Sequence, residues 1–216
     1  MSSKHFARAA KAVMAAGLVL GFGAGRIFAN TNEAVSTWTV RNCEAAFRQE
    51  RNEAARYRAF ARKADAEGYG AVASLFRAAA VAEDAHADNQ AGMIRKLGGT
   101  PSVKIEASVV KTTRENLQAS IDEASRANER KMYEGLMEQA RKQAYAQVAY
   151  MHAEAEESSS ALARMFKSTL ENLDQLKGSK SRTFYVCNVC GHVSGHLPFE
   201  NCNKCFHSRK RFTEVS

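Results

Sequence analysis

The sequence predicts an all-α four-helix bundle with a small metal-binding domain at its C-terminus. From residue 40 to residue 175 alanine, glutamate, lysine and arginine dominate, and this composition favours helix over strand. After residue 178 four of the five cysteines lie close together, in a segment too short to fold on an apolar core alone. The expected parts are an N-terminal segment, the bundle and the cysteine domain, at residues 1–40, 41–177 and 178–216.

Four helices are expected from the spacing of apolar and small residues. Gly68-Tyr69-Gly70 separates the first two, and Gly98-Gly99-Thr100-Pro101 ends the second. Residues 102–112 then serve as the long crossover of a four-helix bundle, and Thr113 caps the third helix. The expected helices cover residues 41–66, 70–97, 114–142 and 145–176.

The two helix pairs look like copies of each other at a shift of 76 residues. Tyr57 then aligns with Tyr133 and Tyr69 with Tyr145, within seven identities over about twenty residues. A duplicated helix hairpin predicts a bundle with pseudo-twofold symmetry. In such bundles metal ions bind between facing helices, where two helices supply carboxylates and the other two supply Glu-x-x-His motifs.

One Glu-x-x-His motif is present, at Glu83 and His86 on the second expected helix. Residues three apart project from one helix face, so this carboxylate and imidazole can hold one iron or manganese ion. Glu50 and Glu53 share a face of the first helix in the same way. Carboxylates buried in the bundle would need a cation. The alternative is that these side chains are ordinary surface groups of amphipathic helices.

The C-terminal cysteines form two Cys-x-x-Cys turns, here called knuckles: Cys187 with Cys190, and Cys202 with Cys205. Two intervening residues allow a tight turn that directs both sulfurs at one point, so two knuckles offer four thiolates in a tetrahedron. This arrangement suits iron or zinc, and the spacing does not choose between them. A pair of disulfides or free thiols is the alternative.

The N-terminal segment combines a basic start with a short apolar run. Lys4, Arg8 and Lys11 precede Ala12 to Gly25, which carries no charge. We interpret the segment as a secretory signal or membrane anchor, which would place the protein on the periplasmic side. A membrane-surface or partner-packing helix and an ordinary buried segment are the alternatives. Reduced cysteines favour the cytoplasm instead, unless metal is already bound.

Two stretches resemble the rubrerythrin family, in which a ferritin-like four-helix bundle is followed by a rubredoxin-like metal domain. In the bundle the resemblance is carried by Phe47-Arg-Gln-Glu50, Ala55-Arg56-Tyr57, Glu67-Gly68-Tyr69 and Glu83-Asp-Ala-His86. In the tail it is carried by Tyr185-Val-Cys187-x-x-Cys190-Gly191, Pro198, Cys202-x-x-Cys205 and Phe212. The resemblance covers roughly residues 41 to 212.

The resemblance implies a di-iron carboxylate site in the bundle and iron at the cysteines. It also implies a homodimer that reduces hydrogen peroxide to water. A redox partner protein would supply electrons, which would pass through the tail site of a partner subunit. Glu50, Glu83 and His86 become the expected catalytic residues. With Glu53 and its aligned partner Glu129, the expected metal ligands are Cys187, Cys190, Cys202, Cys205, Glu50, Glu53, Glu83, His86 and Glu129.

The second half of the bundle departs from this pattern. Under the 76-residue shift Glu83 aligns with Ser159 and His86 with Leu162, so the second Glu-x-x-His motif is missing. The bundle is therefore expected to hold one or two iron ions or a vestigial site, and peroxidase activity is left open. The alternative function is non-enzymatic, with a degenerate bundle and a structural zinc ribbon that binds metal or a partner.

The tail departs from the family as well. Phe206 follows Cys205 where the family usually has glycine, so we expect the second knuckle to be distorted. The net charge of the chain is +8, and part of it lies between Lys204 and Arg211. This basic stretch is either a solvated face or a contact surface for an acidic partner. We do not expect a nucleic-acid partner.

Overall fold

The computed structural model describes the backbone of residues 17–129 and 146–216, and the side chains of residues 39–123 and 146–216. The chain divides into two compact units, residues 1–39 and 40–216, and the bundle and the cysteine tail both belong to the second. None of the described helices is long and apolar enough to cross a membrane. The start of the apolar run expected to act as a signal or anchor, Ala12 to Ala16, lies outside the described residues.

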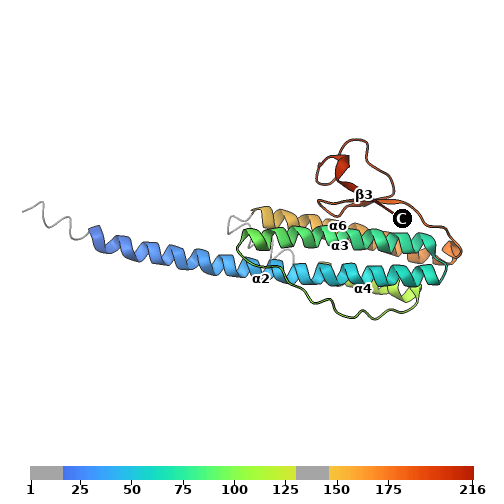
Figure 1. The fold of residues 1–216 in the computed structure, drawn as a ribbon, viewed down its shortest axis with the longest axis horizontal. Helices are drawn as coiled ribbons and strands as arrows, with labels where there is room; N and C mark the ends of the chain where they lie inside the picture. Colours follow the sequence, from blue (N-terminus) through green and yellow to red (C-terminus); the bar gives the residue numbers. More distant parts are fainter. Residues whose placement is uncertain (1–16, 130–145) are drawn as a thin grey trace, which may run out of the picture. The chain divides into compact units, whose positions relative to one another are not determined.

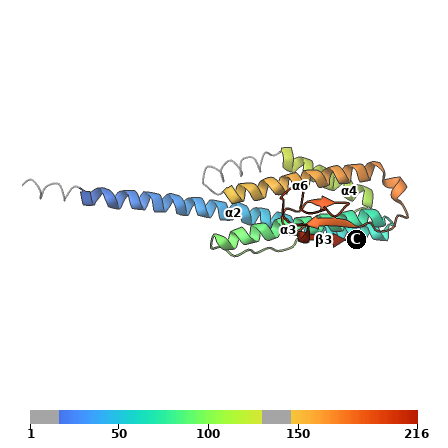
Figure 2. The same ribbon diagram turned by 90° about the horizontal axis from the view of Figure 1, so that it is seen from above.

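The described helices confirm the expected all-α bundle, and Figures 1 and 2 show α3 and α6 side by side. The first helix begins at Gly17, earlier than the expected residue 41, and no proline interrupts it. The last helix gives way to a short 3₁₀ turn at Leu173–Leu176. The helices are α2 (Gly17–Ala66), α3 (Gly70–Lys96), α4 (Thr113–Glu129) and α6 (Ala146–Glu171).

Local chemistry fixes where the helices end. Gly68 and Gly98 end α2 and α3 with φ values of 74° and 84°, which glycine adopts without strain. The cap of α4 is Thr112 and not the expected Thr113. The Thr112 hydroxyl accepts a hydrogen bond from the Glu115 N–H at 3.3 Å, and the Glu115 carboxylate accepts one from the Thr112 N–H at 3.2 Å. This reciprocal pair is a capping box, which places the cap one residue earlier.

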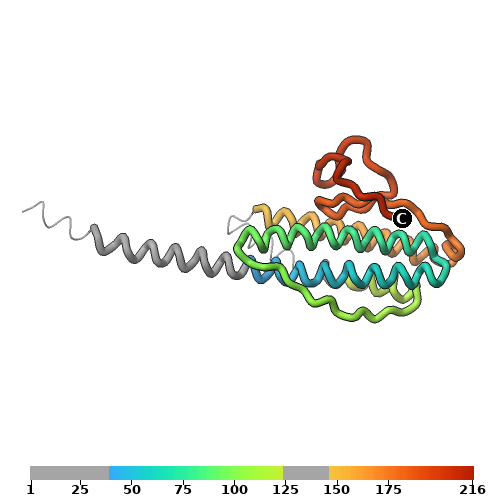
Figure 3. Tube along the Cα trace, viewed as in Figure 1, coloured from blue at the N-terminus to red at the C-terminus, as the bar shows by residue number. Residues whose placement is uncertain are grey.

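The connection between α3 and α4 is the long crossover that the sequence predicts. Residues 101–112 have no regular structure and run along the bundle, as Figure 3 shows. The backbone N–H of Glu106 donates to Asn52 Oδ1 at 2.8 Å, which ties the crossover to α2. Because the crossover returns the chain to the opposite end of the bundle, α4 can pack beside α6.

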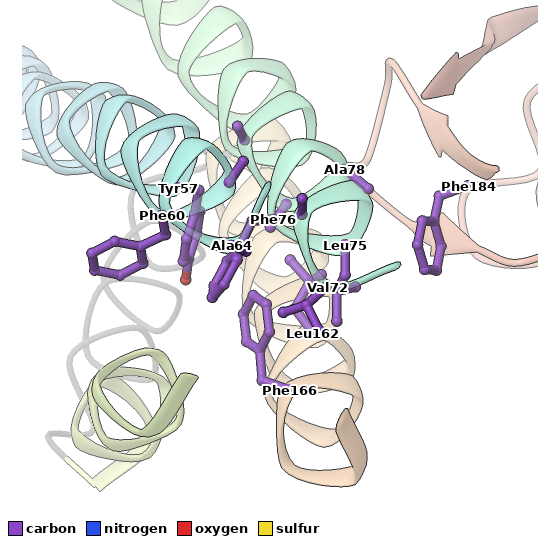
Figure 4. Close-up of a cluster of buried hydrophobic side chains, with 14 of the residues drawn as sticks. Tyr57, Phe60, Ala64, Val72, Leu75, Phe76, Ala78, Leu162, Phe166 and Phe184 are labelled. Atoms are coloured by element: carbon purple, nitrogen blue, oxygen red, sulfur yellow. The ribbon is translucent and has the colours of Figure 1, made fainter. Parts of the chain in front are cut away.

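The tail folds as a three-stranded antiparallel sheet in the order β2-β1-β3, with β1 at Phe184–Cys187, β2 at Val193–Ser194 and β3 at Phe212–Val215. This sheet shares its core with the bundle. Phe184, Val186 and Val193 belong to the same buried cluster as the bundle aromatics, and Figure 4 shows Phe184 on the tail side of that cluster. The tail therefore packs on the helices of its own chain. The bundle aromatics of the cluster are Tyr57, Phe60, Phe76 and Phe166.

Candidate metal sites

The four tail cysteines converge on one point. Their sulfur atoms all lie within 4.8 Å of one another, and all four residues are buried with free thiols. Cys187 and Cys205 lie 3.7 Å apart at their sulfurs, as do Cys190 and Cys202. A tetrahedral ion with metal–sulfur bonds of about 2.3 Å requires sulfurs about 3.8 Å apart. The tetracysteine site thus has the dimensions of a zinc or iron centre, and the disulfide alternative is not what the structure shows.

The second knuckle is not distorted, contrary to the expectation from Phe206. In the first knuckle the Cys187 carbonyl accepts from the Gly191 N–H at 2.9 Å, and in the second the Cys202 carbonyl accepts from the Phe206 N–H at 3.0 Å. Gly191 and Phe206 have matching φ values of 71° and 59°. Phe206 adopts the left-handed conformation that glycine adopts in the first knuckle, so the strain stays in one residue and the turn keeps its shape.

Among the tail thiols, Cys187 is arranged for ionisation. A hydrogen bond with the Cys190 thiol lowers the pKa of Cys187 to about 5, with help from the backbone N–H groups of Cys190 and Val189 and against the effect of burial. The hydrogen bond with Cys187 raises the pKa of Cys190, and burial raises the pKa of Cys205 to about 11. Thiolates are the form that binds metal, and backbone N–H groups aimed at sulfur stabilise that form.

In the bundle, acidic side chains from four helices line one cavity of about 30 Å³. A cavity of this size holds about two water-sized atoms, or a small ion and a ligand. Glu50 and Glu53 come from α2, Glu83 from α3, Glu123 from α4 and Glu156 from α6. The other residues at the wall are Gln49, Tyr57, His86, Ala155, Ser159, Leu162, Ala163 and Phe166.

Burial makes this cavity unfavourable for carboxylates that lack a cation. Glu50 is 3% exposed, and its Oε2 has no hydrogen-bond partner among the described residues. Burial raises the pKa of Glu50 to about 8, and burial with the nearby Glu83 and Glu123 raises that of Glu53 to about 8. A bound cation would satisfy the unpaired oxygen and restore the charged forms. Carboxylate oxygens with one imidazole are a donor set for iron or manganese.

His86 joins the cavity to the tetracysteine site. Its Nδ1 lies 3.2 Å from Glu83 Oε2, and its Nε2 lies 3.1 Å from the carbonyl oxygen of Cys190. Burial lowers the pKa of this imidazole, but the hydrogen bond with Glu83 and the charges of Glu83 and Glu50 outweigh burial and raise it to about 9. Because a carbonyl oxygen only accepts hydrogen bonds, the Nε2 of the ring donates to Cys190. Ligation of a metal by His86 requires one of the two bonds to be given up.

Two further hydrogen bonds hold the first knuckle on the bundle. Asn89 Nδ2 donates to the Val189 carbonyl at 2.7 Å, and Ser158 Oγ donates to the Gly191 carbonyl at 2.8 Å. Ser158 belongs to the serine run that replaces the missing motif on α6. Ser158 therefore binds the tail, whereas its neighbour Ser159 lines the cavity.

Some of the residues that line this cavity were predicted from the sequence, and others were not. Glu50, Glu53, Glu83 and His86 all line it, whereas Glu129 has its side chain outside the described residues. Glu123 was missed because the ungapped 76-residue shift pairs it with Phe47. Its spacing from the buried Leu117 and Ser120 on α4 was the available signal. Glu156 also reaches the cavity from α6, beside Ser159 and Leu162.

The two sites differ in how far they are assembled. Among residues 39–123 and 146–216, the four cysteines are the one group of three or more candidate ligands whose donor atoms all lie within 4.8 Å. In the bundle Glu123 is held by Arg56 in an ion pair of 2.5 Å, and Glu53 accepts from Gln49 at 3.0 Å. The bundle carboxylates must therefore leave these partners to close around an ion.

A family model described as Rubrerythrin matches residues 42–172. Nigerythrin from Nitratidesulfovibrio vulgaris is 26% identical over 194 residues, which cover 86% of this chain and 90% of that protein. The solved structure of fully reduced, all-ferrous nigerythrin has a TM-score of 0.70 at 23% identity, covering 82% of this chain and 86% of the other.

A more distant solved structure shares the bundle. The bacterioferritin of Desulfovibrio desulfuricans, described with a diiron site, has a TM-score of 0.62 at 21% identity, covering 69% of this chain and 92% of its own. The likenesses and the cysteine cluster together confirm a ferritin-like four-helix bundle with a rubredoxin-like tail.

Proposed function

Because the chain belongs to the rubrerythrin family of non-haem iron proteins, we propose that it passes electrons from the tetracysteine site to the bundle cavity and there reduces hydrogen peroxide. The observation that carries this proposal is the position of His86. One ring spans the gap between the Cys190 carbonyl and Glu83, through contacts of 3.1 and 3.2 Å. A continuous hydrogen-bonded path thus joins a metal-binding knuckle to the wall of the cavity.

The reaction consumes two electrons and two protons for each peroxide that becomes two waters. When bound, iron at the cysteines supplies a one-electron relay and iron in the bundle supplies the redox chemistry at peroxide. The residues of the chain would hold these centres in place. Glu50, Glu53, Glu83 and Glu123 surround the reacting volume, and His86 fixes its distance from the relay.

The route that we propose lies within one chain, because the tail contacts its own bundle through Asn89, Ser158 and His86. Electron transfer through the tail of a partner subunit, which the resemblance implies, stays a prediction. A single chain therefore contains both ends of the relay. The homodimer and the redox partner protein stay predictions.

The metal content of the bundle follows from the asymmetry of its ligands. The α6 face of the cavity offers Glu156 but places Ser159 and Leu162 beside it, and neither leucine nor an uncharged serine suits a second iron ion. We propose one iron ion in the bundle and one at the cysteines. Metal analysis of the purified chain should give two iron ions, and three would contradict the single bundle site.

The proposed function is tested by following the oxidation state of the iron at the tetracysteine site through its visible absorption. The iron-loaded chain is reduced and mixed with hydrogen peroxide, and reoxidation of the tetracysteine site is recorded from its visible absorption. Glu83→Gln and His86→Ala should each slow this reoxidation at least tenfold, because they break the path at either side of the ring. Glu171→Ala, on the exposed end of α6, is the matched control and should react at the wild-type rate. Equal rates in all four proteins would rule out the bundle as the catalyst.

A second candidate function is favoured by the missing ligands on α6. Under it the tail is a structural zinc ribbon and the bundle a scaffold. The two proposed functions predict different colours for the native protein. It is red if iron occupies the cysteines and colourless if zinc does.

A further inference from the structure

The two knuckles share one backbone shape but differ in their surroundings. The first knuckle is pressed against the bundle, since a Cβ on Gly191 would lie 2.2 Å from His86 Nε2. At the equivalent position of the second knuckle, Phe206 is 76% exposed. The first knuckle therefore leads to the bundle, and the second presents an aromatic ring to solvent next to a metal ligand.

Phe206 contributes little to the stability of the folded state. Its φ of 59° lies in the left-handed region, which is unfavourable for a residue with a side chain and suits glycine. Its exposure means that little apolar surface is buried in return. A strained, exposed aromatic residue beside Cys205 fits contact with another molecule.

A second exposed ring and a group of cations lie on the same short hairpin. The Glu200 carbonyl accepts from the Arg209 N–H at 2.7 Å, which closes the hairpin around the second knuckle. At its base Phe199 is 87% exposed, and its carbonyl accepts from Arg209 Nη1 at 3.1 Å. Lys210 follows Arg209 and is also exposed.

The net charge of the tail indicates whether an acidic or a basic partner protein is favoured. Residues 178–216 contain six lysines and arginines against two glutamates, a net charge of +4. A ferric ion with four thiolates adds a net charge of −1, so the loaded tail stays positive. Surfaces of opposite charge steer association, which favours an acidic partner over a basic one.

We propose that Phe199, Phe206, Arg209 and Lys210 form an entry face that docks an acidic one-electron carrier protein. The carrier loses one electron, and the ferric ion at the cysteines becomes ferrous, with no bond made or broken. Electrons then enter beside Cys205 and leave beside Cys190, at opposite knuckles. This inference rests on the proposed function for its direction of electron flow, while the docking itself does not depend on the metal being iron.

Binding is tested with the zinc-loaded full chain, in which no electron can move. The probe is an oxidised plant-type [2Fe–2S] ferredoxin, an acidic carrier, titrated by calorimetry at low ionic strength. Phe206→Gly and Lys210→Glu should each weaken binding at least fivefold. Arg62→Glu, the same change of charge on the exposed side of α2, should leave affinity within twofold. Phe206→Gly should also melt no lower than the wild type, because glycine relieves the turn.

Electron entry is tested with the iron-loaded chain and the reduced ferredoxin. The second-order rate of reduction should fall as salt is raised, and Phe206→Gly should lower it at least fivefold while dithionite still reduces both proteins equally. No binding by the wild type, a rate indifferent to salt, or wild-type affinity in Phe206→Gly overturns the entry face. Binding that follows the expected pattern in a protein whose native metal is zinc would contradict the redox function alone.

Discussion

Gly191 lies where the tail touches the bundle, and two independent constraints act on it. Its φ of 71° favours glycine, and a Cβ would lie 2.2 Å from His86 Nε2. The hydrogen bond from His86 to the Cys190 carbonyl exists only because this position has no side chain. The absence of a Cβ at Gly191 thus sets the distance between the two metal sites.

Gly191→Ala should lower the free energy of unfolding by about 3 kcal/mol, the sum of left-handed strain and overpacking. It should also slow reoxidation of the reduced tetracysteine site by peroxide, since the tail must move away from His86. Gly195→Ala is the matched control, because a Cβ there meets nothing within 4 Å, and it should change stability by less than about 0.5 kcal/mol. Equal melting curves for the two variants would contradict the close contact.

At the residue scale, motif spacing predicted the features whose geometry depends only on residues close together in the chain. The knuckles and the Glu83/His86 pair could be read from the sequence because each depends on neighbours in the chain. Glu123 has only its helical spacing on α4 as a signal, because its place at the cavity depends on how α4 packs against α2. The environment of Phe206 also depends on which knuckle faces the bundle, and no spacing encodes that.

The helix α4 is anchored at its start by a residue of the α2–α3 turn. The Glu67 carboxylate accepts from the backbone N–H of Thr113 at 2.8 Å, at the positive end of the α4 dipole. Partial burial acts to raise the pKa of Glu67, but the hydrogen bonds from Thr113 and the ion pair with Lys63 outweigh it and lower the pKa to about 2. The charged carboxylate therefore stabilises the fold.

Glu67→Gln should lower the free energy of unfolding by about 1 kcal/mol at pH 7. A lowered pKa gives stability that is complete above the unfolded value of 4.5 and is lost as the pH falls toward 2. The difference between wild type and variant should therefore shrink between pH 4.5 and pH 3, as measured by urea unfolding. Glu171→Gln should show no such trend. A constant difference across that range would exclude the carboxylate charge as its cause.

At the element scale, the helices and the crossover could be predicted because periodicity and glycine signals are local. The expected start of the first helix at residue 41 is too late, because the apolar run from Ala12 to Gly25 is interpreted as part of a separate N-terminal segment. The cap of α4 was misplaced by one residue because Thr112 and Thr113 are chemically alike, and only the partner Glu115 distinguishes them.

The bundle and the tail belong to one compact unit, residues 40–216. Phe184, Val186 and Val193 of the tail lie in the same buried cluster as the aromatics of α2, α3 and α6. Metal binding at the cysteines should therefore stabilise the helices as well as the tail. The sequence could not predict this shared core, because a polar linker before residue 182 suggests a separately attached domain.

Cys205→Ser should lower the melting temperature of the helices by about 5–10 °C, because loss of one thiolate weakens the metal that holds the tail sheet. Helix melting is followed by circular dichroism at 222 nm, and metal loss by the visible spectrum. Asn203→Ala is the control, because Asn203 is exposed and lies between Cys202 and Cys205. This variant should melt like the wild type. Unchanged helix melting in Cys205→Ser would show that bundle and tail unfold independently.

The contact of Phe184 with the α3 face has a practical consequence for producing the protein. A shortened chain that ends at residue 177 would leave the apolar side chains of α3 near Leu75 and Ala78 in water, where the tail sheet now covers them. Uncovered apolar surface of this kind drives self-association. The shortened bundle should precipitate or form oligomers at concentrations where the full chain stays in solution, so the tail also governs solubility.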